Sequence, residues 1–259
     1  MNMSAIEIAA KGPIAVVGGS QTDQGKTTVA KFLSQYAEVL GVDARHIMID
    51  KPENPPDGED IRFSATDADF KQLMVALASI CPGQLPVLDL GGHAFEKFMR
   101  ADKAFGGEVR TEIKLFIVPV MANTKEALVL STVQSFIQLG APPEHIVIVF
   151  NRVTGEEEAA AIASSFPLLH EASQKLGFRI CSEPVYLHSI VAECRGTNAN
   201  LFALAALDRA EIIEQRKAAH AANNEPEFER LVQLQTRRGM AQEPVANFTH
   251  VFNKILGVR

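Results

Sequence analysis

Residues 14–28 read IAVVGGSQTDQGKTT, an apolar run that ends in glycines and then opens into Gly25-Lys26-Thr27-Thr28. A glycine-rich turn between a buried strand and a helix lets backbone amides converge on a phosphate, because glycines remove side chains and adopt unusual dihedral angles. The lysine of such a loop adds a full positive charge near the β- and γ-phosphates, and the hydroxyl that follows ligates Mg²⁺. The stretch therefore predicts a magnesium nucleotide site at the first strand–helix junction.

The spacing of this loop is unusual. The common pattern places four residues between its two glycines, whereas five residues separate Gly19 from Gly25. We expect Lys26 to neutralise phosphate charge, Thr27 to hold Mg²⁺ and Thr28 to lie near the α-phosphate. The remaining nucleotide-binding positions predicted in the loop are Gly19, Gln21, Asp23, Gln24 and Gly25.

The rest of the chain alternates apolar runs with amphipathic segments. Nearly continuous apolar runs predict strands that are covered on both faces, at residues 13–18, 45–50, 85–90, 114–120, 145–150 and near 178–182. Amphipathic patterns predict helices over 26–40, stopped by Gly41, and over 124–139, where Glu126 suggests a cap. The expected fold class is α/β, with a doubly wound, mostly parallel sheet flanked by helices and a helical C-terminal extension.

The pattern becomes helical after about residue 186, and residues 221–227 resemble a hinge. We expect an ATPase domain over 1–220 and a helical segment over 221–259 that packs on it or contacts a partner. The last residues carry one apolar helical stripe, formed by Phe248, Val251, Phe252, Ile255 and Leu256. This stripe predicts packing on the domain or a dimer contact; a membrane anchor over 246–259 is weakly supported, because only Lys254 and Arg259 are basic.

Composition restricts the class of protein. The 259 residues are 47% hydrophobic, and no apolar run approaches the roughly 18–20 residues of a membrane span. No secretory signal is expected, and the three cysteines suit idle thiols in a cytoplasmic protein. The net charge of −6 does not favour nucleic acid. Arg237 and Arg238 could touch DNA, but two arginines give weak support.

Five segments in order resemble the deviant P-loop ATPases of the ParA/MinD group, and the resemblance covers residues 13–195. They are GGSQTDQGKTT, IMIDKP, PVLDLGG, LFIVPVMANTKEALVLSTVQSFIQLG and VIVFNRV. Within that group the chain looks most similar to divergent plasmid stability and conjugation ATPases of the StbB-like or TraL-like kind. The first segment is also similar to the loop of dethiobiotin synthetase.

The resemblance implies a cytoplasmic ATPase that binds ATP and Mg²⁺ and forms a nucleotide-dependent homodimer. It further implies a protein partner from a plasmid stability, partition or transfer system. By the same resemblance, Asp50 orients the attacking water near the metal, and Asp89 faces Mg²⁺ through water. Gly92 then senses the γ-phosphate, and Asn151, flanked by Arg152, meets the adenine.

Two departures from the family pattern leave alternatives open. Gln21 stands where ParA/MinD proteins carry a lysine that crosses to the partner's nucleotide, and Asp50 is followed by Lys51-Pro52. Lys51 resembles a substrate-binding lysine of dethiobiotin synthetase, so an ATP-dependent ligase is the second hypothesis. A nucleotide-binding adaptor without hydrolysis is the third. His93 either touches phosphate or belongs to the first turn of a helix.

Overall fold

The fold was analysed in a computed structural model of the chain. The model describes residues 14–19, 21, 23–50, 61–64, 71, 73, 75, 77, 84–104, 113–138, 140–196 and 199–257. Lys51, the polar segment 53–60 and Cys81 lie outside the described residues.

The described residues contain one sheet of eight strands in the order β3-β2-β4-β1-β5-β6-β7, with β8 also paired to β6. Every pair of neighbouring strands is parallel. The strands are β1 (Ile14–Val17), β2 (Asp43–Asp50), β3 (Ile61–Ser64), β4 (Gln84–Leu90), β5 (Ile113–Met121), β6 (Ile146–Val153), β7 (Arg179–Ile180) and β8 (Val185–Tyr186). The predicted strands are thus confirmed, and β3 and β8 are additional to them.

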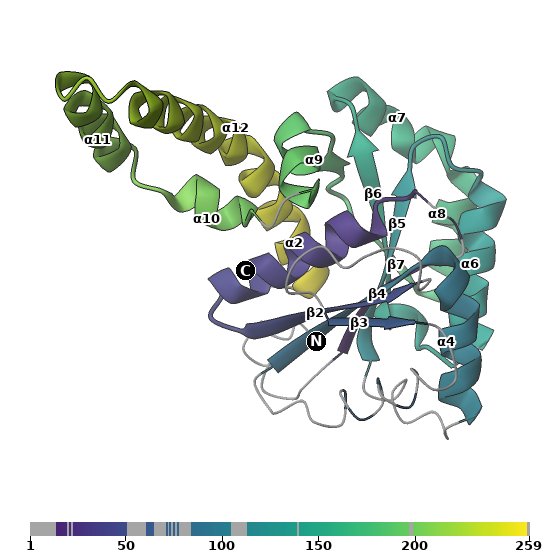
Figure 1. Ribbon diagram of the computed structural model, residues 1–259. Helices are drawn as coiled ribbons and strands as arrows, with labels where there is room; N and C mark the ends of the chain where they lie inside the picture. Colours follow the sequence, from purple (N-terminus) through teal and green to yellow (C-terminus); the bar gives the residue numbers. More distant parts are fainter. Residues whose placement is uncertain are drawn as a thin grey trace.

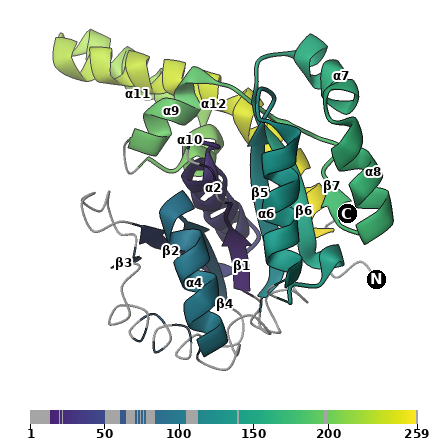
Figure 2. The ribbon, with the colours of Figure 1, turned by 90° about the vertical axis from the view of Figure 1, so that its right-hand side faces the viewer.

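Helices cover both faces of the sheet (Figures 1 and 2). One apolar cluster joins α2, α9, α10 and α12 to one face, and a second joins α4, α6, α7 and α8 to the other. This is the predicted doubly wound arrangement. The helices are α2 (Lys26–Val39), α4 (Gly92–Ala104), α6 (Glu126–Gln138), α7 (Glu156–Ser165), α8 (Pro167–Leu176), α9 (Ser189–Gly196), α10 (Leu201–Ala206), α11 (Arg209–Ala221) and α12 (Glu225–Leu256), with a 3₁₀ turn at Pro143–His145.

The central strands have few exposed positions because both of their faces are covered. Residues Leu85–Leu90 of β4 are buried throughout, and β6 has one half-buried position in eight. The chain runs from β1 outward to β2 and β3, returns through β4, and then continues at β5 on the other side of β1. The C-terminal end of β1 is therefore the point where the strand order reverses, which is where open α/β sheets bind ligands.

Two helices differ from the prediction. Helix α6 begins at Glu126, two residues later than expected, and the Glu126 carboxylate accepts a hydrogen bond from the Leu169 amide in α8. The helical region expected after about residue 186 is divided between α10 and α11, where the Asp208 carboxylate caps a new helix at the Ala210 amide, 2.7 Å away.

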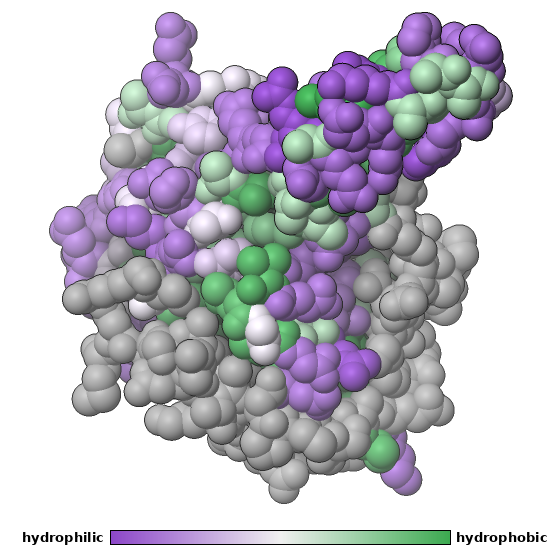
Figure 3. Space-filling model, turned by 90° about the vertical axis from the view of Figure 1, so that its left-hand side faces the viewer, coloured by the Kyte–Doolittle hydropathy of each residue, from purple (hydrophilic) through white to green (hydrophobic). Residues whose placement is uncertain are grey.

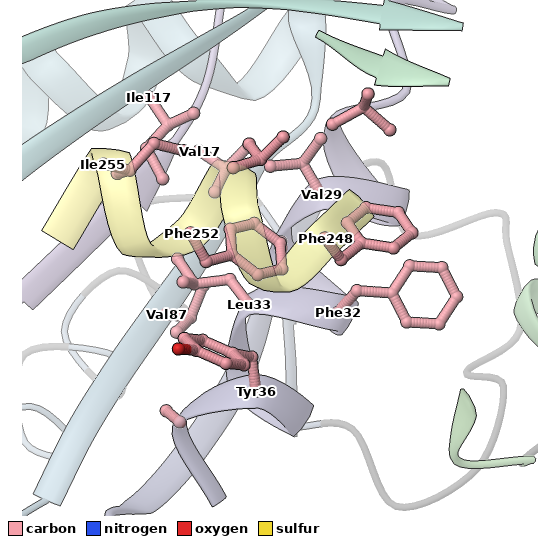
Figure 4. Packing of buried hydrophobic residues seen from close by; sticks show 14 of the residues in the cluster. Val17, Val29, Phe32, Leu33, Tyr36, Val87, Ile117, Phe248, Phe252 and Ile255 are labelled. Carbon is pink, nitrogen blue, oxygen red and sulfur yellow. The ribbon is translucent and has the colours of Figure 1, made fainter. Parts of the chain in front are cut away.

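The last turns of α12 pack into the core beneath α2 (Figure 4). Phe248 and Phe252 are fully buried, with ring centroids 4.9 Å from Phe32 and 5.6 Å from Tyr36, respectively. The other members of the predicted stripe, Val251, Ile255 and Leu256, are buried as well. The stripe therefore packs on the domain, and this face of α12 is covered by protein instead of being free for a membrane.

The first half of α12 runs back along α11, and the two helices project from the body of the molecule (Figure 1). The turn between them, with Asn223 at a φ of 50° and Asn224 capping α12, lies where the hinge was predicted. A small cluster of Ile212, Ala219 and Leu231 holds the pair together. Figure 3 views the side from which they project, and mainly hydrophilic residues cover the upper part of that face.

Both arginines considered for DNA contact bind within the protein. Arg237 forms an ion pair with Glu193 of α9 at 2.7 Å, and Arg238 donates to the Leu207 carbonyl at 2.5 Å. Of the helices that the structure describes, none combines the length and the apolar character needed to cross a membrane. Cys181 and Cys194 are buried free thiols.

We predict that Phe252→Ala lowers the free energy of unfolding by about 3–5 kcal/mol, because it opens a cavity between α12 and α2. Urea unfolding followed by circular dichroism measures this change. Leu168→Ala, at a helical position that is 56% exposed, is the control and should change stability by less than about 0.5 kcal/mol. Equal effects of the two substitutions would contradict the packing of α12.

Candidate functional site

The predicted phosphate loop connects β1 to α2 at the reversal point of the sheet (Figure 2). The Gly18 amide continues the strand pairing by donating to the Ile117 carbonyl of β5 at 3.0 Å. Gly25 is the N-cap residue of α2, and Lys26 and Thr27 begin that helix. The amides of the first helical turn therefore face the loop, with the positive end of the helix dipole behind them.

Gly25 is held in place by a side chain from β6. Its φ is 78°, a left-handed conformation that favours glycine, and a Cβ at this position would lie 2.1 Å from the Nδ2 atom of Asn151. Asn151 is 1% exposed, and its Nδ2 donates to the Gln24 carbonyl at 2.8 Å. The predicted contact of this residue with adenine stays a prediction. In the structure its amide nitrogen binds the loop at Gln24.

The side chain of Gln24 ties the same loop to the end of β5. Its Oε1 accepts from the Met121 amide and from the Thr124 hydroxyl, both at 2.9 Å. Only a small cavity of about 10 Å³, roughly the space of one water, lies between the loop and residues of β5 and α6. Gln24, near the end of the loop, is thus held on two sides by contacts with Met121, Thr124 and Asn151.

Lys26 lies folded into the loop. Its side chain is buried at 7% exposure, and its ammonium donates to the Gln21 carbonyl. A buried ammonium needs hydrogen-bond acceptors, and phosphate oxygens are stronger acceptors for it than a neutral carbonyl. The residues therefore fit an anionic group at the mouth of the loop, where Thr27 is half-buried and Asp23 is exposed with a φ of 60°.

Asp89 lies beside the end of β1, paired in register with Val17. Side chains alternate along a strand, and Val87 belongs to the cluster under α2 whereas Leu88 and Leu90 belong to the opposite one. The Asp89 side chain therefore points to the face of the sheet on which α2 packs. It is 2% exposed.

His46 of β2 approaches Asp89 from the neighbouring strand. Its Nε2 atom lies 3.7 Å from Asp89 Oδ2, and both side chains are almost fully buried. Sequence analysis identified Asp89 from the segment PVLDLGG, but it missed His46, because the contact joins two strands and His46 has no local motif. The only available signal was the alternation of β2, which puts His46 on the same face as Ala44.

For the other predicted positions near this edge of the sheet, Asp50, Gly92 and His93, the structure describes the backbone. Asp50 is the last residue of β2, and Gly92 is the first residue of α4, following a hydrogen bond from the Gly91 amide to Ile49. His93 falls in the first turn of α4, as one of the two interpretations expected. The side chains of Asp50 and His93 lie outside the described residues.

A larger pocket adjoins the start of α2. Its volume is about 430 Å³, within the range of roughly 300–1,000 Å³ that is usual for small-molecule sites. Residues from the ends of β5 and β6, from α7, from β8 and from α9 line it, together with one residue of α2. They are Thr28, Met121, Ala122, Asn123, Asn151, Arg152, Thr154, Glu158, Val185, Tyr186, Leu187, His188, Val191, Ala192 and Arg195.

Most of the surface that lines this pocket is apolar, and its charged side chains are two arginines, Arg152 and Arg195, and one acid, Glu158. The Thr154 amide and hydroxyl donate to Glu158 at 2.6 and 2.8 Å, and the amide's hydrogen bond in particular lowers the pKa of that carboxyl, which keeps it ionised. Sequence analysis predicted Thr28, Asn151 and Arg152 as nucleotide-binding residues, but it did not identify the other residues of this pocket, because they come from separate elements.

Arg152 has a backbone conformation that is rare outside glycine. Its φ is 58°, and the pairing of β6 with β8 shifts register between Asn151 and Val153. A bulge of this kind redirects side chains, and a left-handed non-glycine residue costs about 1–3 kcal/mol, which is a feature common at functional sites. At this bulge, Asn151 contacts the loop at Gln24 and Arg152 lines the pocket.

Among the described residues, no group of three or more His, Cys, Asp or Glu side chains could hold a metal ion on its own. This is compatible with Mg²⁺, which protein sites often bind through one or two side chains and the phosphates of a substrate. Thr27 and Asp89 are the described side chains that would serve it, and their role stays a prediction.

We predict that Gly25→Ala destabilises the protein more than Gly177→Ala. Both glycines have left-handed φ angles, of 78° and 86°, but a Cβ at Gly177 meets nothing within 4 Å. The control should lose about 1–2 kcal/mol from backbone strain alone, and Gly25→Ala should lose a further ~1–3 kcal/mol, since the Asn151 amide must leave its hydrogen bond. Urea titrations of both variants measure the difference, and equal losses would disprove the close contact.

No protein-family model matches the sequence, and no curated protein is similar to it. Among solved structures, a Cyanothece McdA variant in complex with ATP is 16% identical, with 71% of this chain and 86% of that one covered at a TM-score of 0.42. A nucleotide-binding protein from Archaeoglobus fulgidus in complex with ADP is 14% identical, with coverages of 76% and 90% and a TM-score of 0.47. An LAO/AO transport system kinase is 15% identical, with coverages of 96% and 72% and a TM-score of 0.40. Similarities of this size do not assign the chain to a family.

Proposed function

We propose that the chain binds a nucleoside triphosphate with Mg²⁺, the phosphates on the β1–α2 loop and the nucleoside in the adjoining pocket. The observation that carries this proposal is the buried Lys26 ammonium, which lies within a loop that Gln24 and Asn151 hold in shape. A rigid set of amides with a lysine at a helix N-terminus is suited to a multiply charged phosphate chain.

Different residues would contact different parts of the ligand. The loop amides and Lys26 would contact the phosphates, and Thr27 with Asp89 would hold the metal, which supplies neutralising charge to the phosphate oxygens. Thr28 lines the pocket from the first turn of α2, so it links the phosphate end to the nucleoside end. The sequence contains no Asn-Lys-x-Asp guanine motif, which favours adenine.

We predict that Lys26→Ala weakens binding of Mg²⁺–ATP at least about a hundredfold, because several charge-assisted hydrogen bonds are lost. Isothermal titration calorimetry on nucleotide-free protein measures the affinity. Lys31→Ala is the matched control, since Lys31 lies on the same helix and its Nζ is directed to the Cys194 carbonyl at 3.5 Å. The control should bind as the wild type does, and equal binding by Lys26→Ala would contradict the proposal.

The finer proposal is a slowly hydrolysing ATPase of the ParA/MinD type, whose nucleotide state governs dimerisation and partner binding. Its support is the resemblance, together with the position of Gly92 at the start of α4, three residues after Asp89. A phosphate-sensing loop there could change shape on hydrolysis. The setting in plasmid stability, partition or conjugation, and a separate role for residues 221–259, rest on the resemblance and the sequence pattern.

A nucleotide switch predicts a change in mass. With a slowly hydrolysed ATP analogue and Mg²⁺, we expect the wild type to shift from monomer to dimer in size-exclusion chromatography with light scattering, and Lys26→Ala to stay monomeric. Lys31→Ala, the control used for binding, should dimerise as the wild type does. An unchanged wild-type mass would count against the switch.

Phosphate release then separates the three hypotheses of activity. Slow release with ATP alone supports the ATPase. Release only with an added carboxylate or carbamate would favour a ligase of the dethiobiotin synthetase type, and tight binding without release would favour an adaptor.

A further inference from the structure

We infer that Asn247 of α12 is a positioning residue for the nucleoside pocket, so that the last helix sets part of the affinity for the nucleoside. This inference rests on the proposed function. Asn247 does not line the pocket; it acts on the backbone of β8, which does.

The part of the pocket wall that β8 forms is held to the sheet by a short stretch of backbone pairing. This strand is two residues long, and it pairs with β6 at Val185 and Tyr186 across a register shift. One further backbone bond, from the Leu187 amide to the Val153 carbonyl at 2.8 Å, continues the pairing. Four consecutive pocket residues, Val185 to His188, lie on this short segment.

Both polar atoms of the Asn247 side chain form hydrogen bonds with this segment. Its Oδ1 accepts from the Tyr186 amide at 3.0 Å, and its Nδ2 donates to the Pro184 carbonyl at 2.9 Å. One side chain thus satisfies a backbone donor in β8 and a backbone acceptor in the residue before it, as a neighbouring strand would. The bond partners are more than 60 residues away in the sequence.

The same helix reaches the second wall of the pocket and the phosphate loop's helix. Arg237 pairs with Glu193 of α9 at 2.7 Å, and α9 contributes Arg195 to the pocket. Phe248, the neighbour of Asn247, packs on Phe32 of α2. Because α12 contacts α2, β8 and α9, it fixes the spacing between the residues at the phosphate end and those at the nucleoside end.

A purely structural role for Asn247 would give a different result from a positioning role. A loss of stability alone would lower the affinity of every ligand by the same factor, or would change no affinity at all. A displaced β8 wall would weaken a ligand that enters the pocket and spare one that occupies only the loop. Magnesium tripolyphosphate is such a loop-only probe, since it has the phosphates of ATP and no nucleoside.

The experiment compares Mg²⁺–ATP with Mg²⁺–tripolyphosphate by calorimetry on Asn247→Ala and on Asn253→Ala. Asn253 is the matched control, because it lies on the same helix and accepts a hydrogen bond from the Tyr36 hydroxyl in the core. We expect Asn247→Ala to bind ATP roughly tenfold more weakly, as for the loss of two neutral hydrogen bonds, and to bind tripolyphosphate within about twofold of the wild type. Asn253→Ala should leave both affinities unchanged.

Unchanged ATP affinity in Asn247→Ala, or an equal loss for both probes, would overturn the inference. Wild-type protein that binds tripolyphosphate as tightly as ATP would also overturn it, because the pocket would then contribute nothing. Wild-type protein that binds neither probe would instead refute the proposed function.

Hydrogen exchange on the wild type keeps the test decisive if Asn247→Ala does not fold. The Tyr186 amide, which donates to Asn247, should gain protection with Mg²⁺–ATP and not with Mg²⁺–tripolyphosphate. The same protection with both probes, or with neither, would overturn the inference.

Discussion

The contact between the Asn151 amide and Gly25 is the constraint on which the candidate site depends. It requires a residue without a Cβ at the start of α2, and it brings a buried hydrogen-bond donor from the end of β6 to the Gln24 carbonyl. The Gln24 side chain adds a second attachment to the end of β5. The end of the loop at Gln24 and Gly25 is therefore held by contacts with the sheet, which would reduce the conformational entropy lost if a phosphate binds there. The Lys26 ammonium already lies within the loop, where it donates to the Gln21 carbonyl, and phosphate oxygens would be stronger acceptors for it.

The two ends of the site differ in how they are built. The loop proposed to bind the phosphates lies between β1 and α2, next to deeply buried central strands. The pocket proposed for the nucleoside is lined in part by short or strained pieces: β8 has two residues, and Arg152 adopts a left-handed conformation in a bulge. Such pieces keep their geometry only where their surroundings hold them. Helix α12 provides this support, because its last turns are anchored in the core and its Asn247 binds the β8 backbone.

The sequence predicts the features that short-range patterns encode. The apolar runs are long enough to mark the central strands, Gly25-Lys26-Thr27 marks the loop, and the stripe from Phe248 to Leu256 marks a buried helix face. Contacts between residues that are far apart in the sequence leave no such local pattern. Asn151 and Gln24 are 127 residues apart, and the approach of His46 to Asp89 depends on the order of β2 and β4 in the sheet. Strand β3, with the sequence IRFS, and the two-residue strand β8 lack the continuous apolar runs that mark the central strands, and the break before α11 depends on a single capping carboxylate at Asp208.

A crystal structure with Mg²⁺ and a slowly hydrolysed ATP analogue tests the central claim most directly. The account predicts phosphate oxygens against the amides of residues 24–27, with the Lys26 ammonium moved from the Gln21 carbonyl to the phosphates and with Asn151 still bound to the Gln24 carbonyl. A nucleotide bound elsewhere, with Lys26 still on the Gln21 carbonyl, would contradict it.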